Sequence, residues 1–136
     1  MTIRSAHDTD RRRSGLASLE LVIVLPLVVL VLFAACEFAL LFQGRQSLVT
    51  ASRSGARVAS LAGATYWDVE DAVRSELAGS FGDDLTVEAE LGERSGDVVW
   101  VRLSAPMRAA SPDLLKMIGL GLVGRDLFAE TTMCKE

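Results

Sequence analysis

The sequence predicts an α+β protein, in which a long N-terminal transmembrane helix continues as a stalk into a small extracytoplasmic head with a short antiparallel sheet. The 136 residues are enough for one small domain and too few for two independent cores. Half of them are hydrophobic and the mean hydropathy is +0.32, although 24% are charged. The apolar residues must therefore be concentrated, and they form one N-terminal block that precedes segments of mixed polarity.

The apolar block covers residues 21–42 and contains one charge in 22 residues, Glu37. A helix of this length is about 33 Å long, which is enough to cross a hydrocarbon core of about 30 Å. Pro26 removes one backbone donor and kinks a helix, a change that membrane helices tolerate. A chain this short could scarcely bury a helix that is apolar on every face. We therefore assign residues 16–42 to a transmembrane helix.

Charge is divided unevenly along the chain. Residues 1–15 form a basic leader with four arginines and two aspartates. Three of these arginines lie shortly before the span, which favours a cytoplasmic N-terminus. Residues 64–136 carry seven basic and fourteen acidic residues, a net charge of −7. We expect a single-pass membrane protein whose C-terminal domain is extracytoplasmic, and the acidic domain argues against nucleic acid as a partner.

Two glutamates lie in or beside the apolar block. Glu20 stands at its cytoplasmic edge and Glu37 lies five residues before its outer edge. An ionisable group at membrane depth costs a few kcal/mol, so it normally has a partner or a function. Two interpretations of Glu37 remain: it has a function inside the membrane, or its carboxylate extends to the outer interface near Arg45. Glu20 precedes a long apolar run and follows three arginines, which is unusual for a plain membrane anchor.

Small and apolar residues recur at helical spacing after the span, so we expect the helix to continue as a stalk through residues 43–62. Ala51, Gly55 and Ala59 would let another helix approach closely, as in membrane helix pairs with small residues four apart. Two alternatives remain at this point. The approaching helix belongs to another subunit, or the stalk lies on its own domain.

Residues 63–136 form the predicted head. An apolar stripe over residues 65–78 predicts a second helix. Apolar and polar residues then alternate over residues 85–91 and 99–104, and the loop between these segments predicts a β-hairpin. The remaining expected elements are a short helix that starts near Pro112 and a last strand over residues 127–133.

The chain offers little for enzymatic chemistry, and we expect no catalytic residue, cofactor or metal. The one histidine, His7, lies in the leader, so the rest of the chain lacks a histidine base. One histidine and two cysteines are too few for a His/Cys metal cage. Gly119, Gly121 and Gly124 imitate a dinucleotide-binding pattern, but they follow a predicted helix and the twelve residues left cannot form the βαβ unit.

A basic leader that ends in Gly15, with Glu20 at the fifth position after it, resembles the class III signal of type IV pilin-like proteins. In that family a membrane prepilin peptidase cuts after the glycine on the cytoplasmic face. The resemblance implies that Leu16 becomes the new N-terminus and that the apolar helix stays on the mature protein.

Further residues are similar to those of TadE-like proteins, the minor pseudopilins of the tight-adherence (Flp) pilus system. They are Glu20, Pro26, Glu37-Phe38, Arg45, Ala51 and Ala56-Arg57. The resemblance implies a bacterial membrane protein that assembles or primes a pilus by helix packing. Its partners would be the bilayer, the prepilin peptidase and other pilin-like subunits, either another minor pseudopilin or the major pilin. Glu20 would pair with a neighbour's N-terminal amine, and Pro26 and Glu37 would belong to the helix that sets subunit register.

Two other functions compete with this one. Residues 32–36 resemble a lipoprotein box, which would make the chain a lipid-anchored extracytoplasmic protein acylated at Cys36, although residues 37–42 stay apolar where lipoproteins turn polar. Leu21 stands where processed pilin-like proteins have an aromatic residue, so an uncleaved single-pass protein with a small binding head is the other alternative. Cys134 would be a free thiol or link two subunits.

Overall fold

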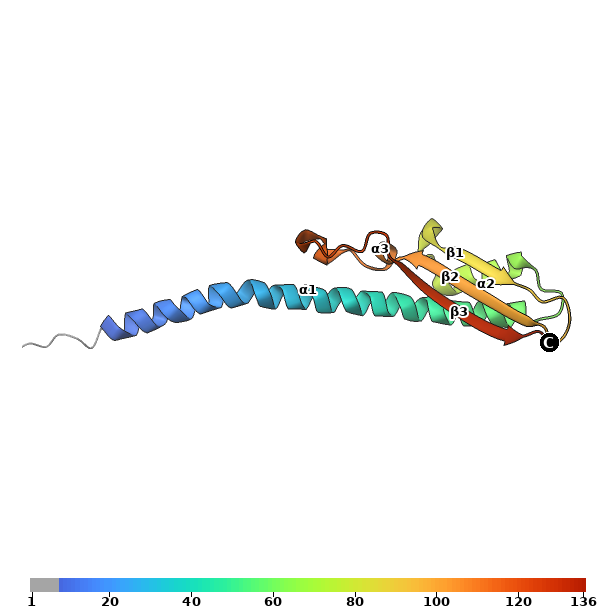
Figure 1. Cartoon of the computed structure of the whole chain (residues 1–136), viewed down its shortest axis with the longest axis horizontal. Coiled ribbons are helices and arrows are strands. Elements are labelled where there is room, and N and C mark those ends of the chain that lie inside the picture. Colours follow the sequence, from blue (N-terminus) through green and yellow to red (C-terminus); the bar gives the residue numbers. More distant parts are fainter. Residues whose placement is uncertain (1–7) are drawn as a thin grey trace, which may run out of the picture. The chain divides into compact units, whose positions relative to one another are not determined.

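The computed structural model of the chain describes residues 8–136, with side chains from residue 18 onward. The elements are α1 (Asp8–Ala59), α2 (Tyr66–Leu77), the 3₁₀ turn η1 (Gly82–Asp84), β1 (Thr86–Glu90), β2 (Val98–Pro106), α3 (Met107–Ala110), the 3₁₀ turn η2 (Leu114–Ile118) and β3 (Asp126–Cys134) (Figure 1). Contacts divide the chain into two compact units, one up to Cys36 and one from Glu37 to Glu136.

The first unit is the N-terminal part of α1. The helix that contains it has an 18-residue window with a mean hydropathy of 2.9, and none of that window is buried. Pro26 lies inside the helix and does not end it. An apolar helix that its own chain leaves uncovered is what a membrane span requires. The predicted long apolar helix is thus confirmed, and it is compatible with a single-pass membrane protein.

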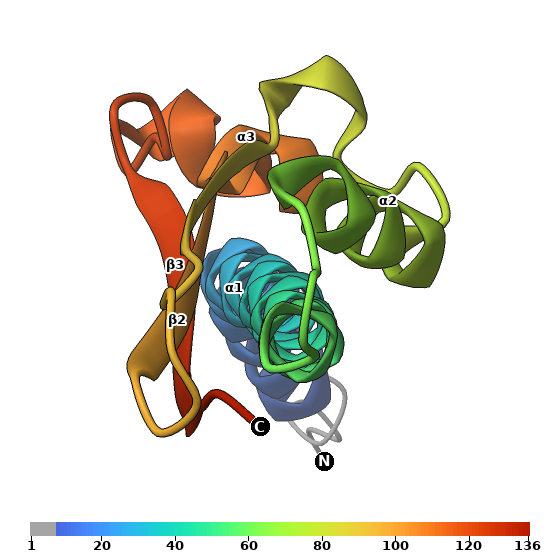
Figure 2. The same ribbon diagram turned by 90° about the vertical axis from the view of Figure 1, so that its right-hand side faces the viewer.

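The second unit is the head, a three-stranded antiparallel sheet in the order β1-β2-β3 with α2 and the C-terminal part of α1 on one face (Figure 2). The alternation predicted from the sequence is present, because Val99, Val101 and Leu103 are fully buried between more exposed neighbours. Leu103 pairs with Val87 on β1 and with Ala129 on β3. The predicted α+β fold with a short antiparallel sheet is confirmed.

The second helix begins with a capping box at Thr65. The Thr65 hydroxyl accepts the backbone N–H of Asp68, and the Asp68 carboxylate accepts the backbone N–H of Thr65 at 2.8 Å. Two otherwise unpaired donors of the first turn are thereby satisfied. The helix ends at Ala78, which adopts a left-handed conformation with φ 46°. The predicted helix over residues 65–78 is therefore confirmed.

The capping box should make the stability of the head depend on pH through the Asp68 carboxylate. Hydrogen bonds from the Thr65 hydroxyl and the Thr65 backbone N–H lower the pKa of Asp68 below its ordinary value. Because the folded-state pKa is depressed, this contribution to stability is present above the unfolded pKa and is lost as pH falls through the folded pKa. We expect an NMR titration of Asp68 to show the lowered pKa and Thr65→Ala to raise it. An unchanged pKa in Thr65→Ala would contradict this origin.

The segment between β2 and β3 differs from the predicted helix that starts near Pro112. A four-residue helix, α3, precedes Pro112, and η2 starts only after Asp113, which has a left-handed φ of 57°. A left-handed residue cannot continue a helix, so Pro112 stays outside η2. Gly119, also left-handed at φ 84°, ends η2 after five residues. The predicted short helix before Gly119 is thus present as η2, and only the expectation that Pro112 lies in its first turn was wrong, for this reason.

Candidate functional site

The predicted site residues are distributed over both units. The predicted processing site, Gly15 and Leu16, lies on the α1 backbone before the first residue whose side chain is described. Glu20 and Pro26 lie in the first unit. Glu20 is exposed on α1, and its neighbours Leu19 and Leu21 are 59% and 64% exposed. The Glu20 carboxylate is therefore accessible to lipid, solvent or another helix around α1.

Glu37 is buried in the head unit, with 2% of its surface exposed. The Ser111 hydroxyl donates to its Oε1 at 3.4 Å, and the backbone N–H of Leu115 donates to its Oε2 at 3.1 Å. The carboxylate thus links α1 to the end of α3, at Ser111, and to η2, at Leu115. Buried carboxylates are costly without such donors. The sequence suggested Arg45 as a neighbour of Glu37 and missed these two donors, which lie more than seventy residues away along the chain.

Removing this carboxylate should loosen the segment it holds. In Glu37→Ala the partly buried N–H of Leu115 and the Ser111 hydroxyl lose their acceptor, which typically costs about 1–3 kcal/mol. We expect faster hydrogen exchange at Leu115, measured by mass spectrometry on the full chain in detergent. Glu37→Gln keeps one acceptor oxygen and should change the exchange less. Equal exchange in wild type and Glu37→Ala would show that the carboxylate does not hold the segment.

The small residues of the predicted stalk lie inside the head. Ala51 and Ala59 have no exposed surface. A Cβ added at Gly55 would lie 2.7 Å from Val73 Cγ2 on α2 and 3.4 Å from Val101 Cγ1 on β2. The helix that approaches α1 here is thus the chain's own α2, which corresponds to the second of the two alternatives that the sequence left open.

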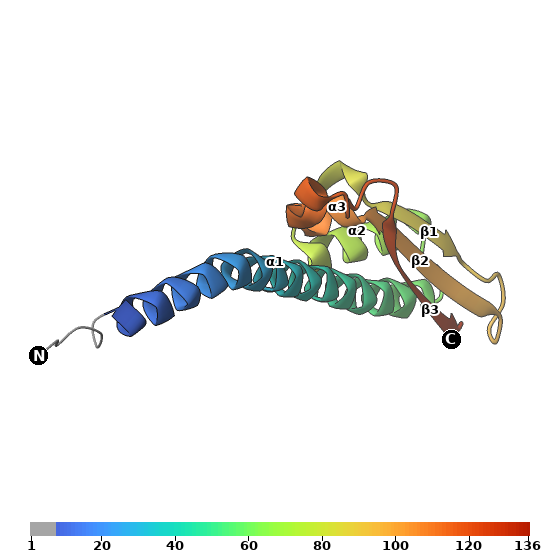
Figure 3. The ribbon, with the colours of Figure 1, turned by 60° about the vertical axis from the view of Figure 1, so that its left-hand side comes forward.

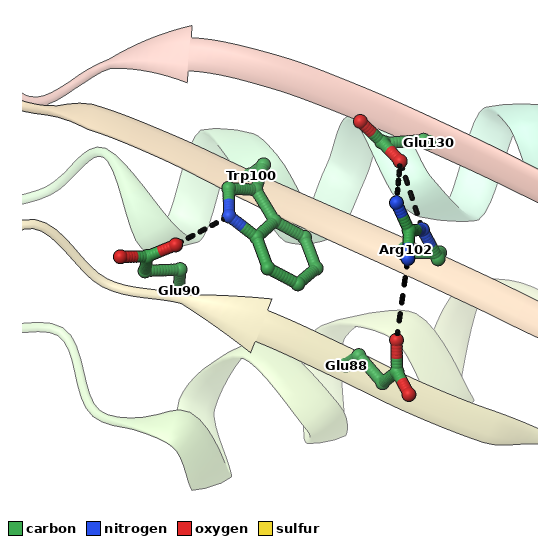
Figure 4. Close-up of polar contacts among 5 residues, drawn as sticks. All are labelled: Glu88, Glu90, Trp100, Arg102 and Glu130. Carbon is green, nitrogen blue, oxygen red and sulfur yellow. Dashed lines mark hydrogen bonds and ion pairs between the residues drawn. The ribbon is translucent and has the colours of Figure 1, made fainter.

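The outer face of the sheet carries a row of cross-strand polar contacts (Figure 4). Arg102 bonds Glu130 on β3 at 2.7 Å and lies 3.8 Å from Glu88 on β1. Its guanidinium is 5.3 Å from the centre of the Trp100 ring, and the Trp100 indole N–H donates to Glu90. These side chains are about half exposed, so each ion pair contributes little on its own. Their role is pairing between strands.

Two further features of the described residues are a surface groove and two free cysteines. A groove of about 830 Å³ lies beside the end of α1 and is lined by both signs of charge, including Arg53, Arg57 and Glu76. Cys36 and Cys134 are both free and exposed. Among the described residues, no group of three His, Cys, Asp or Glu side chains could hold a metal ion.

The comparisons with known proteins concern the N-terminal part of the chain. A family model described as TadE-like protein matches residues 15–57. The match includes Glu20, Pro26 and Glu37 and ends before α2 and the sheet. No curated protein and no solved structure gave a significant match. The family match supports a pilus-associated, pseudopilin-like role and a membrane location. The resemblance predicted from the sequence is therefore confirmed: over residues 15–57 the chain is similar to the TadE-like proteins.

Proposed function

We propose that this protein is a minor pseudopilin that helps to assemble or prime a tight-adherence (Flp) pilus by helix packing, and that it has no enzymatic activity. The observation that carries the proposal is an apolar helix, left uncovered by its own chain, inside the segment that matches the TadE-like family. An uncovered apolar helix is stable in a bilayer or against other apolar helices. The partners would be the bilayer and another minor pseudopilin or the major pilin.

In this proposal each part of the chain has its own task. Residues 1–15 are a cytoplasmic leader that prepilin peptidase removes. Residues 16–42 cross the bacterial cell membrane, and residues 43–62 form the stalk. Residues 63–136 form the extracytoplasmic head, which determines which subunits meet. The three arginines that lie shortly before the span support this orientation.

Cleavage after Gly15 would give Glu20 its partner. It would free an amine on Leu16, four residues before the carboxylate. A carboxylate and an ammonium attract strongly in a low-dielectric environment, whereas each alone is costly there. Pairing of Glu20 with the Leu16 amine of a neighbouring subunit would therefore fix the offset between two helices, with Pro26 and Glu37 at set distances along the same helix.

The proposal predicts the mass of the mature protein. We expect protein purified from membranes of a host with a prepilin peptidase to begin at Leu16, as measured by intact mass spectrometry. Gly15→Leu should block the cleavage and leave the full-length mass. A full-length wild-type species would favour the uncleaved single-pass protein with a small binding head, and a species that begins at a diacylglyceryl Cys36 would favour the lipid-anchored protein.

A further inference from the structure

One segment of the head exposes apolar side chains that the sheet and helices do not cover. Residues 114–124 contain a single charge, Lys116. Met117 is 96% exposed, and Leu120 and Val123 are 62% and 69% exposed. Contiguous exposed apolar residues mark a site that contacts a partner or a membrane.

This segment is folded, so its exposed side chains are not a consequence of missing structure. The backbone N–H of Leu120 donates to the Leu115 carbonyl at 3.2 Å. The Asp113 carboxylate accepts the backbone N–H of Leu122 at 3.1 Å, and the Leu122 side chain is buried. Several of its backbone N–H groups are thus bonded internally while its apolar side chains are exposed. An interfacial membrane contact needs this combination, because unpaired backbone groups are costly in lipid.

The bond between Glu37 and Leu115 sets the level of the segment along α1. Glu37 lies five residues before Phe42, the end of the apolar run, which corresponds to about 7.5 Å of helix. Phe38 and Phe42 belong to the same unit and are 71% and 55% exposed. The segment therefore lies beside the last apolar turns of α1 and not beyond them.

We propose that residues 114–124 insert into the outer leaflet beside α1 and give the head a second contact with the membrane. The inference rests on the proposed span of α1. If residues 16–42 cross the bilayer, the hydrocarbon edge lies near Phe42, and the segment held by Glu37 reaches about 7.5 Å inside that edge. Met117 and Leu120 would enter the acyl boundary, as the apolar face of an interfacial element does. Lys116 would extend its ammonium to the headgroups.

The observations favour lipid over a protein partner. The exposed side chains lie near the level at which α1 also exposes the apolar side chains of Phe38 and Phe42. A membrane contact would also explain why a buried carboxylate fastens this segment to α1, since the bond holds the segment at a fixed depth. The β1–β2 loop lies at the opposite end of the sheet from η2 (Figure 3), and it would then be the part of the head farthest from this contact.

The test places a fluorescent label at Met117 in the full chain. Cys36→Ala and Cys134→Ser remove the native thiols, and Met117→Cys carries an environment-sensitive NBD group. The protein is reconstituted as single copies in phosphatidylcholine nanodiscs that contain lipids with a nitroxide on the headgroup or deep in the acyl chain. Two matched positions are labelled in the same way, exposed Ser95 in the β1–β2 loop and Val28 in the apolar helix.

We expect the label at Met117 to lose most of its fluorescence with the shallow nitroxide, the label at Val28 with the deep one, and the label at Ser95 with neither. Equal behaviour at Met117 and Ser95, with Val28 quenched, would overturn the second contact and leave the span intact. An unquenched Val28 would overturn the span and the contact together. A blue-shifted but unquenched label at Met117 would mean that protein, and not lipid, covers the segment, which also overturns the proposal.

Discussion

Replacing Glu20 with alanine should abolish incorporation into pili without reducing insertion into the membrane. Loss of the carboxylate leaves the neighbour's Leu16 amine without its partner in a low-dielectric environment, so the paired state loses its main electrostatic attraction. Insertion should not suffer, because a charged residue near a span is a cost that alanine does not carry. The measurement is an immunoblot of sheared pili and of membranes from a host whose own copy has been deleted.

Two variants separate the charge from the shape of the helix. Val22→Ala removes an exposed apolar side chain close to Glu20 and should leave piliation close to wild type. Glu20→Asp keeps the charge on a shorter side chain and should restore part of the assembly. Normal amounts of pili in Glu20→Ala would remove the role proposed for this carboxylate, whatever the processing of the leader.

The elements that could be predicted from the sequence are those whose pattern is local. Val99, Val101 and Leu103 alternate with more exposed residues, so β2 could be placed from period two alone. The apolar stripe predicted a helix over residues 65–78, which is within one residue of α2 at each end. The long apolar helix could be predicted from the composition and the length of the apolar block alone. In each case the information lies within one continuous stretch of the chain.

What the sequence could not supply depends on contacts between distant residues. The partners of Glu37 lie at Ser111 and Leu115, and a carboxylate alone does not indicate which backbone N–H it will accept. Nothing in the sequence indicated that Gly44 must stay small. A Cβ added there would lie 2.8 Å from Ala110 Cβ on α3, a residue far away along the chain. Whether Gly55 packs inside the chain or between subunits was also open, because both arrangements need the same small residue.

The packing at Gly55 predicts a second large effect, on folding. Alanine normally stabilises an α-helix relative to glycine by about 1 kcal/mol. At position 55 the new Cβ would lie 2.7 Å from Val73 Cγ2, so we expect Gly55→Ala to lower the free energy of unfolding by about 1–3 kcal/mol instead. The measurement is denaturant unfolding of the full chain in detergent, followed by tryptophan fluorescence. Arg53→Ala, at an exposed position on the same helix, is the control and should have little effect.

A double-mutant cycle identifies the clash. Val73→Ala removes the methyl group that meets the new Cβ, so Gly55→Ala combined with Val73→Ala should cost less than the sum of the two single changes. Additive losses would mean that α2 does not press on α1 at this point. If Gly55 instead faced another subunit, Gly55→Ala would leave the unfolding of the isolated protein unchanged or make it harder, and only assembly would suffer. The cycle therefore distinguishes packing inside the head from packing between subunits.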